Sequence, residues 1–170
     1  MKDLDKILTY NRQHVNAHLA KAEVYEATGK TKLAINALNN VIRIKPNEAI
    51  YHLKRGILLE ADHEVVMAAE DFKTATNLDP KNTDAALKYG MYCFSRQFWE
   101  DAIKYFERAL DSKETCVTAL CFRTKCNSQM SKWDDAFRVL IKTYIYTLLT
   151  IDMEPLLRIG HFSSDPKRSQ

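Results

Sequence analysis

Three cysteines in the second half of the chain have a side chain that commonly binds metal. Cys116, Cys121 and Cys126 follow one another at intervals of five positions, whereas zinc ligands usually come in close pairs such as C-x2-C that converge on one point. Five residues along a helix turn a side chain by about 140°, so Cys121 and Cys126 should point apart. We interpret these cysteines, and Cys93, as buried or half-buried thiols that pack like small apolar residues. We expect no metal site.

Two histidines also have a spacing that metal sites use. His14 and His18 are four residues apart, which places two side chains on one face of a helix. His14 precedes the first expected helix of its segment, however, and no third ligand is evident, so we interpret His18 as a packing residue. The sequence has no G-x-S-x-G, no phosphate-cradling glycine loop and no H-E-x-x-H. We therefore expect a protein without catalytic activity or cofactor.

The composition is that of a soluble, helical protein. Hydrophobic residues make up 46% of the chain and charged residues 28%, with only four glycines and four prolines for turns. The net charge of +3 argues for neither nucleic acid nor a membrane surface as partner. The charged N-terminus is unlike a signal peptide, and the most apolar run, residues 144–151, is too short to span a membrane. We expect a cytoplasmic location.

A period of 34 residues runs through the chain. Pro46 and Pro80 are 34 residues apart, as are Gly56 and Gly90, so we number positions 1 to 34 in windows that begin at Val15, Ala49, Thr83 and Val117. Three columns then agree: position 8 holds Ala22, Gly56, Gly90 and Thr124; position 20 holds Ala34, Ala68, Ala102 and Ala136; and position 24 holds Leu38, Phe72, Phe106 and Leu140. Such recurrence is typical of repeat architectures.

Each window predicts two helices that pack against each other. Apolar residues recur with helical periodicity over positions 2–14 and again over positions 18–31. Small residues at positions 8, 20 and 27 would let the two backbones approach, and the large residue at position 24 would fill the space beside them. Residues 2–11 predict one further helix.

These residues resemble the tetratricopeptide repeat (TPR), a 34-residue helix-turn-helix unit. The second window is most similar to it, through Gly56, Leu59, Ala68, Phe72, Ala75 and Leu78-Asp79-Pro80. The fourth window is weak, and the family's turn glycine at position 15 is present only as Gly29. The resemblance implies an all-α fold, a right-handed α-solenoid of antiparallel helix pairs with about four repeats and an extra helix at each end.

The resulting domain organisation has seven segments. We expect an N-terminal helix (1–14), four repeats (15–48, 49–82, 83–116 and a degenerate 117–150), a C-terminal helix (151–162) and a disordered tail (163–170). The outer helices are either caps that shield the end repeats from water or half-repeats of a longer array.

The resemblance also implies a binding surface. First helices of this family line a concave groove, to which positions 2, 5, 9 and 12 contribute. Carried onto this chain, those positions give an apolar strip with acidic residues at one flank: Ile50, Leu53, Ile57, Leu87, Met91 and Phe94, with Glu23 and Glu60. We predict that this strip binds an amphipathic helix or apolar peptide of a partner protein. Two other interpretations stay open: packing between adjacent first helices, or coverage by the chain's own C-terminal helix.

One binding mode of the family is not expected. Some co-chaperone TPR domains bind acidic C-terminal tails through Lys and Asn at positions 5 and 9 of one repeat, Asn at position 6 of the next, and Lys and Arg at positions 2 and 6 of the third. Windows one to three offer Leu19, Glu23, Lys54, Asp84 and Lys88, and windows two to four offer Leu53, Ile57, Lys88, Thr118 and Phe122. Neither set forms a carboxylate clamp, since Glu23 and Asp84 would repel a carboxylate.

A structural role is the alternative function. The end repeats could stack on another subunit or on a second copy of the chain, as a homo-oligomer. The run Tyr144, Ile145, Tyr146, Leu148 and Leu149 carries more apolar surface than one helix pair needs.

Overall fold

The structure, a computed structural model, describes residues 2–112, 116–131 and 141. The chain divides into two compact units, Met1–Asn127 and Ser128–Gln170. In the second unit the described residues, 128–131 and 141, are helical. The second helix expected for repeat four, the expected C-terminal helix (151–162) and the expected tail (163–170) lie outside the described residues.

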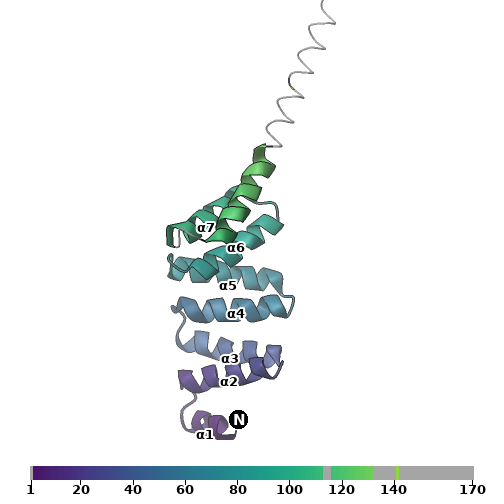
Figure 1. Ribbon diagram of the computed structural model, residues 1–170. Helices are drawn as coiled ribbons and strands as arrows, with labels where there is room; N and C mark the ends of the chain where they lie inside the picture. Colours follow the sequence, from purple (N-terminus) through teal and green to yellow (C-terminus); the bar gives the residue numbers. More distant parts are fainter. Residues whose placement is uncertain (1, 113–115, 132–140, 142–170) are drawn as a thin grey trace, which may run out of the picture. The chain divides into compact units, whose positions relative to one another are not determined.

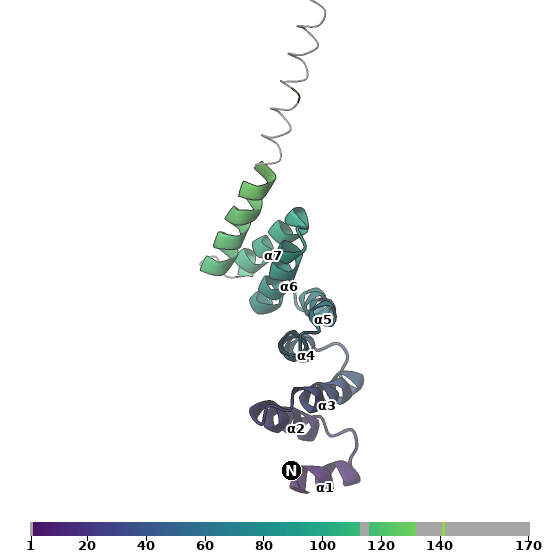
Figure 2. The same ribbon diagram turned by 90° about the vertical axis from the view of Figure 1, so that its right-hand side faces the viewer.

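Seven labelled helices make up most of the first unit, and residues 117–127 are helical as well. The helices are α1 (Lys2–Tyr10), α2 (Val15–Ala27), α3 (Thr31–Ile44), α4 (Ala49–Ala61), α5 (Val65–Leu78), α6 (Thr83–Ser95) and α7 (Trp99–Ser112). Each one packs on the next in the chain, so that they follow one another like rungs (Figure 1). In the turned view, α2 and α4 are displaced to one side of α3 and α5 (Figure 2). No strand occurs in the described residues.

The predicted helices of the first three windows are confirmed, with a constant offset. Each observed helix begins and ends one residue before the segment that apolar periodicity predicts. At α2 and α6 the earlier start coincides with a side-chain N-cap at the residue before position 1. The side chains of His14 and Asn82 accept hydrogen bonds from the backbone N–H groups of Ala17 and Ala85.

The turns inside the three hairpins share one geometry although only one contains glycine. Position 15 has a left-handed backbone in each, with φ of 70° at Gly29, 66° at His63 and 64° at Gln97. The following N–H donates to a carbonyl five residues earlier, as from Glu64 to Leu59 at 2.9 Å, which satisfies a helix C-terminus. The turn therefore survives the loss of the family's glycine.

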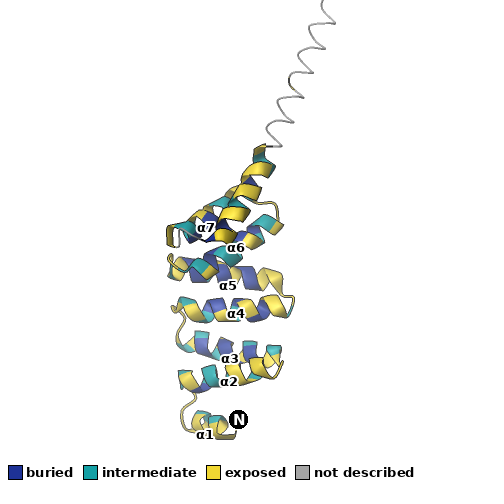
Figure 3. Cartoon of the chain, viewed as in Figure 1, coloured by how far each residue is buried: buried dark blue, intermediate teal, exposed yellow. Residues whose placement is uncertain are grey.

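Three successive clusters form the core, one for each repeat. The columns that the period revealed are its centre: Ala34, Ala68 and Ala102 are at most 1% exposed, and Leu38, Phe72 and Phe106 at most 2%. Each cluster also takes in residues that follow its own repeat, such as Leu58 of α4 beside Leu38 and Ala85 of α6 beside Phe72. Figure 3 shows the buried residues running through the successive helices. This is an all-α solenoid, because each hairpin covers the apolar side of its neighbour.

None of the helices in residues 2–112 or 116–131 combines the length and apolar character that crossing a bilayer requires.

Candidate partner-binding groove

The predicted groove residues lie on the first helices α2, α4 and α6, with different exposure. Ile50, Ile57 and Met91 are 46%, 41% and 38% exposed, which is high for large apolar side chains. Glu23 and Glu60 are exposed, whereas Leu87 and Phe94 are half-buried. An apolar, acid-flanked surface therefore does run along these helices.

Leu53 is the exception, because it is only 6% exposed. It packs in one cluster with Phe72 of α5 and Ala85 of α6. Leu53 at position 5 is therefore a core residue here and not part of the exposed surface.

Phe94 is largely used in packing, both within its own repeat and against the next one. Its ring meets that of Trp99 edge-on with centroids 5.2 Å apart, and that of Phe122 with centroids 5.1 Å apart. Such pairs stabilise by about 0.5–1.5 kcal/mol beyond the area they bury. The packing interpretation thus describes Phe94 better than it describes Ile57 or Met91.

A cleft of about 120 Å³ opens between α2, α3 and α4. Its apolar lining comes from Leu19, Ala22, Leu38, Ile57 and Leu58, and its charged lining from Glu23, Glu26 and Lys54. The predicted groove residues Glu23 and Ile57 are therefore brought together at this cleft.

The lysines of this surface already face carboxylates of the chain. Lys54 Nζ lies 3.5 Å from Glu23 Oε1, and Lys88 Nζ lies 2.5 Å from Glu60 Oε2. Both pairs join position 6 of one repeat to the first helix of the repeat before it. Both lysines on the predicted groove surface are thus paired within the chain.

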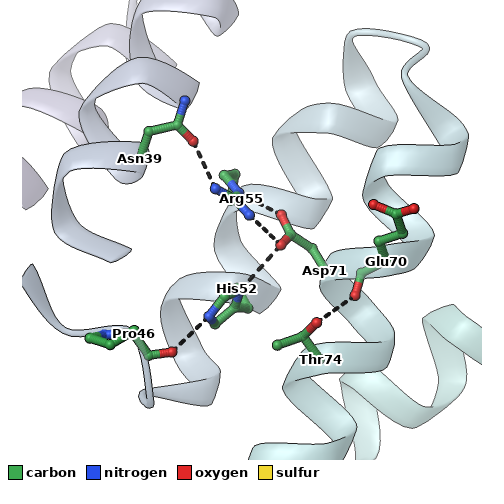
Figure 4. A network of polar contacts seen from close by, with 7 residues as sticks. All are labelled: Asn39, Pro46, His52, Arg55, Glu70, Asp71 and Thr74. Atoms are coloured by element: carbon green, nitrogen blue, oxygen red, sulfur yellow. Dashed lines mark hydrogen bonds and ion pairs between the residues drawn. The ribbon is translucent and has the colours of Figure 1, made fainter. Parts of the chain in front are cut away.

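An ionic network around a buried aspartate, which joins α3, α4 and α5, was not predicted from the sequence (Figure 4). Asp71 of α5 is 4% exposed. Arg55 of α4 donates to both its carboxylate oxygens at 2.6 Å, and His52 Nδ1 lies 3.2 Å from Oδ1. The network extends to α3, where Asn39 accepts from Arg55 at 2.8 Å, and to the Pro46 carbonyl oxygen, 2.9 Å from His52 Nε2. It ties the first repeat to the second.

Arg55 and Asp71 stand at positions 7 and 23 of the second repeat. In the first and third repeats, residues at these positions make contacts of a different kind. In the third repeat these positions hold Tyr89 and Tyr105, whose rings pack edge-on with centroids 4.5 Å apart; burial raises the pKa of Tyr89 to about 12. In the first repeat, Lys21 at position 7 pairs with Asp5 of α1 at 2.8 Å. The buried ion pair could have been predicted from the sequence, because the second repeat has an arginine at position 7 and an aspartate at position 23.

The histidines and cysteines considered as ligands have other partners or surroundings. His14 Nδ1 accepts from Ala17 N–H at 3.1 Å, and His18 Nε2 lies 3.0 Å from the Arg12 carbonyl oxygen. Cys126 is buried and Cys121 exposed, so these two side chains do point apart. Burial raises the pKa of both the Cys93 and the Cys126 thiol. Within the described ranges, no three His, Cys, Asp or Glu side chains gather as a metal site.

Comparison with known proteins decides the family. Sequence models described as Tetratricopeptide repeat match residues 53–115 and 15–48, together more than half of the chain. The chain belongs to the tetratricopeptide repeat family.

Curated TPR relatives are much longer than this chain. It is 26% identical over 117 residues to human Tetratricopeptide repeat protein 13, a match covering 69% of this chain and 14% of that protein. It is 27% identical over 100 residues to the Small glutamine-rich tetratricopeptide repeat-containing protein 2 of Mycosarcoma maydis, covering 55% of this chain and 28% of that protein. The chain therefore spans under a third of either relative.

Solved TPR structures share the fold. The crystal structure of MamA has a TM-score of 0.67 at 19% identity, covering 88% of this chain and 87% of its own. The first TPR of Spaghetti (RPAP3), bound to the HSP90 peptide SRMEEVD, has a TM-score of 0.62 at 22% identity, covering 70% and 94%. At these identities the likeness establishes the TPR fold alone.

Proposed function

We propose that this TPR chain is a non-catalytic protein-interaction scaffold that holds a helix or apolar peptide of a partner protein against α2, α4 and α6. The observation that carries the proposal is the apolar surface of Ile50, Ile57 and Met91 beside the cleft between α2 and α4. Exposed apolar side chains that gather on one face mark binding sites more often than chance. TPR neighbours solved with peptides support the general role. The partner is a protein, bound in the cytoplasm, and not nucleic acid or a membrane.

The proposed groove is not a carboxylate clamp. Lys54 and Lys88 stand at position 6, where clamp domains meet an acidic tail, but both are paired with Glu23 and Glu60. An incoming carboxylate would have to displace a glutamate and would meet its charge at close range. The peptide SRMEEVD, which the RPAP3 domain binds, should therefore show no saturable binding to this chain by calorimetry. Micromolar binding of this peptide would show that the surface does act as a carboxylate clamp.

The groove itself is tested by matched substitutions and affinity capture. Ile57→Glu with Met91→Glu places charges on the groove at two exposed sites, where folding should be preserved. Val66→Glu, on α5 at a site 60% exposed, is the control. We expect proteins captured by the full chain to be lost with the double variant and kept with the control. Retention of every captured protein by the folded double variant would refute the groove.

A second candidate is a role in assembly, favoured by α1. This helix lies where the second helix of a preceding repeat would be, and Leu4 and Ile7 fall at positions 24 and 27. Those positions are fully buried in α3, α5 and α7, yet Ile7 is 40% exposed. A second subunit could cover this face. Light scattering over a range of concentrations should then show a rising mass that Ile7→Asp abolishes; a constant monomer mass would count against assembly by this face.

A further inference from the structure

We propose that the cleft between α2 and α4 receives one aliphatic side chain of the partner, and that a neighbouring arginine or lysine of the partner pairs with Glu23 and Glu26. The inference rests on the proposed groove function and specifies its ligand. It assigns the partner an apolar anchor flanked by positive charge.

The size and lining of the cleft fit a single aliphatic anchor. Its volume is about 120 Å³, somewhat below the roughly 150 Å³ of an apolar cavity that holds benzene. Leu19 and Ala22 of α2 form one wall, and Ile57 and Leu58 of α4 another. Because Ile57 is 41% exposed here, a leucine, isoleucine or methionine would remove apolar surface from water on both partners.

The carboxylates at the edge of the same cleft favour a positive charge on the partner residue that flanks the anchor. Glu23 and Glu26 are three residues apart on α2, so both carboxylates lie on one face of the helix. Only Lys54 opposes them at this cleft, and its Nζ is 3.5 Å from Glu23. A guanidinium can donate hydrogen bonds to both carboxylates.

An acidic flanking residue would be disfavoured at the same place. It could reach Lys54 only beside Glu23, and Glu26 would add a second repulsion. The site is also solvent-exposed, so each ion pair contributes under about 1 kcal/mol and the preference should weaken with salt. The apolar anchor supplies affinity, and the carboxylates supply discrimination between partners.

Two amphipathic helical peptides of equal length test this inference on the full chain. Both carry the same leucine stripe; one has arginine and the other glutamate on its polar face. We expect fluorescence anisotropy to show about tenfold tighter binding of the arginine peptide, a difference that two or three exposed ion interactions can supply. The whole chain carries a net charge of +3, so non-specific attraction would favour the glutamate peptide instead.

Matched variants locate the effect. Glu23→Lys with Glu26→Lys should reverse the preference, Ile57→Glu should abolish binding of the arginine peptide, and Glu107→Lys on α7 should change neither. Equal binding of both peptides, no binding of either, or a preference that survives the Glu23 and Glu26 changes would overturn the inference. Those outcomes leave the groove function to be decided separately, by the capture experiment with Ile57→Glu and Met91→Glu.

Discussion

At the scale of single residues, the close packing of the helices depends on glycines at position 8 of two repeats. Gly56 and Gly90 at position 8 face the rings of Phe72 and Phe106 at position 24. A Cβ placed on Gly56 would lie 2.6 Å from Phe72 Cε1, and one on Gly90 would lie 2.8 Å from Phe106 Cε1. In the second and third repeats, the two helices can approach this closely only because position 8 is glycine.

Gly56→Ala should therefore destabilise the protein, although alanine is the better helix former by about 1 kcal/mol. The rigid ring of Phe72 must move, and overpacking of this kind costs about 1–3 kcal/mol. Urea denaturation measures the change in free energy of unfolding. Adding Phe72→Leu should recover part of the loss; a Gly56→Ala protein more stable than wild type would show that propensity outweighs the close packing.

In the hairpin turns, introducing a glycine should stabilise the protein. His63 and Gln97 adopt the left-handed backbone of Gly29, which costs a non-glycine residue about 1–2 kcal/mol. His63→Gly should relieve this strain and raise the free energy of unfolding. The gain should not exceed about 1 kcal/mol, because the greater entropy of glycine in the unfolded chain offsets part of it. Gly29→Ala should lower it. If His63→Gly is destabilising, side-chain contacts of His63 must outweigh the backbone strain.

Thiol reactivity should follow burial. Cys121 is exposed, whereas Cys93, Cys116 and Cys126 are buried, and burial raises the pKa of the Cys93 and Cys126 thiols, keeping them protonated and unreactive to higher pH. Brief treatment of the folded chain with iodoacetamide near pH 8 should alkylate Cys121 first, as peptide mass spectrometry can measure. Faster modification of Cys126 would contradict the packing described for the helix at residues 117–127.

At the scale of elements, the period in the sequence predicted helices well but predicted their contacts less well. Small residues at positions 8 and 20 located the hairpins because few residue types fit between close backbones. At α2 and α6 the one-residue offset reflects the caps His14 and Asn82, whose local hydrogen bonds apolar periodicity does not record.

The groove could be predicted only in part, for a related reason. A family position fixes a side chain's direction, but exposure depends on the neighbouring hairpin. Leu53 and Ile57 share α4, yet Leu53 packs near Ala85 and Ile57 remains exposed. Asp71 was missed because its partners, His52 and Arg55, lie on another helix and are distant in the sequence.

The different residue pairs at positions 7 and 23 of the second and third repeats give a prediction at this scale. Asp71→Ala should cost about 3 kcal/mol or more, because it leaves the Arg55 guanidinium partly buried without its partner. Transplanting the third repeat's residues, as His52→Ala, Arg55→Tyr and Asp71→Tyr, should restore most of that loss, since apolar replacements of buried ion pairs are often neutral. Denaturation midpoints compare the variants; a triple variant as unstable as Asp71→Ala would show that the pairs are not equivalent.

At the scale of the whole molecule, the described residues form three stacked hairpins, with α1 before them and one helix after them. Residues 2–112 and 116–131 form successive clusters and no single closed core, because each hairpin buries its apolar side against its neighbours. The long relatives are consistent with such a unit occurring within a larger protein. The function proposed for it depends on which side of the stack the partner contacts.

Hydrogen exchange on the full chain, with and without a purified captured partner, tests that claim most directly. The account predicts added protection in α2, α4 and α6, strongest around Ile57 and Met91, with little change in α3, α5 and α7. Protection confined to the second helices, or to α1 alone, would contradict it.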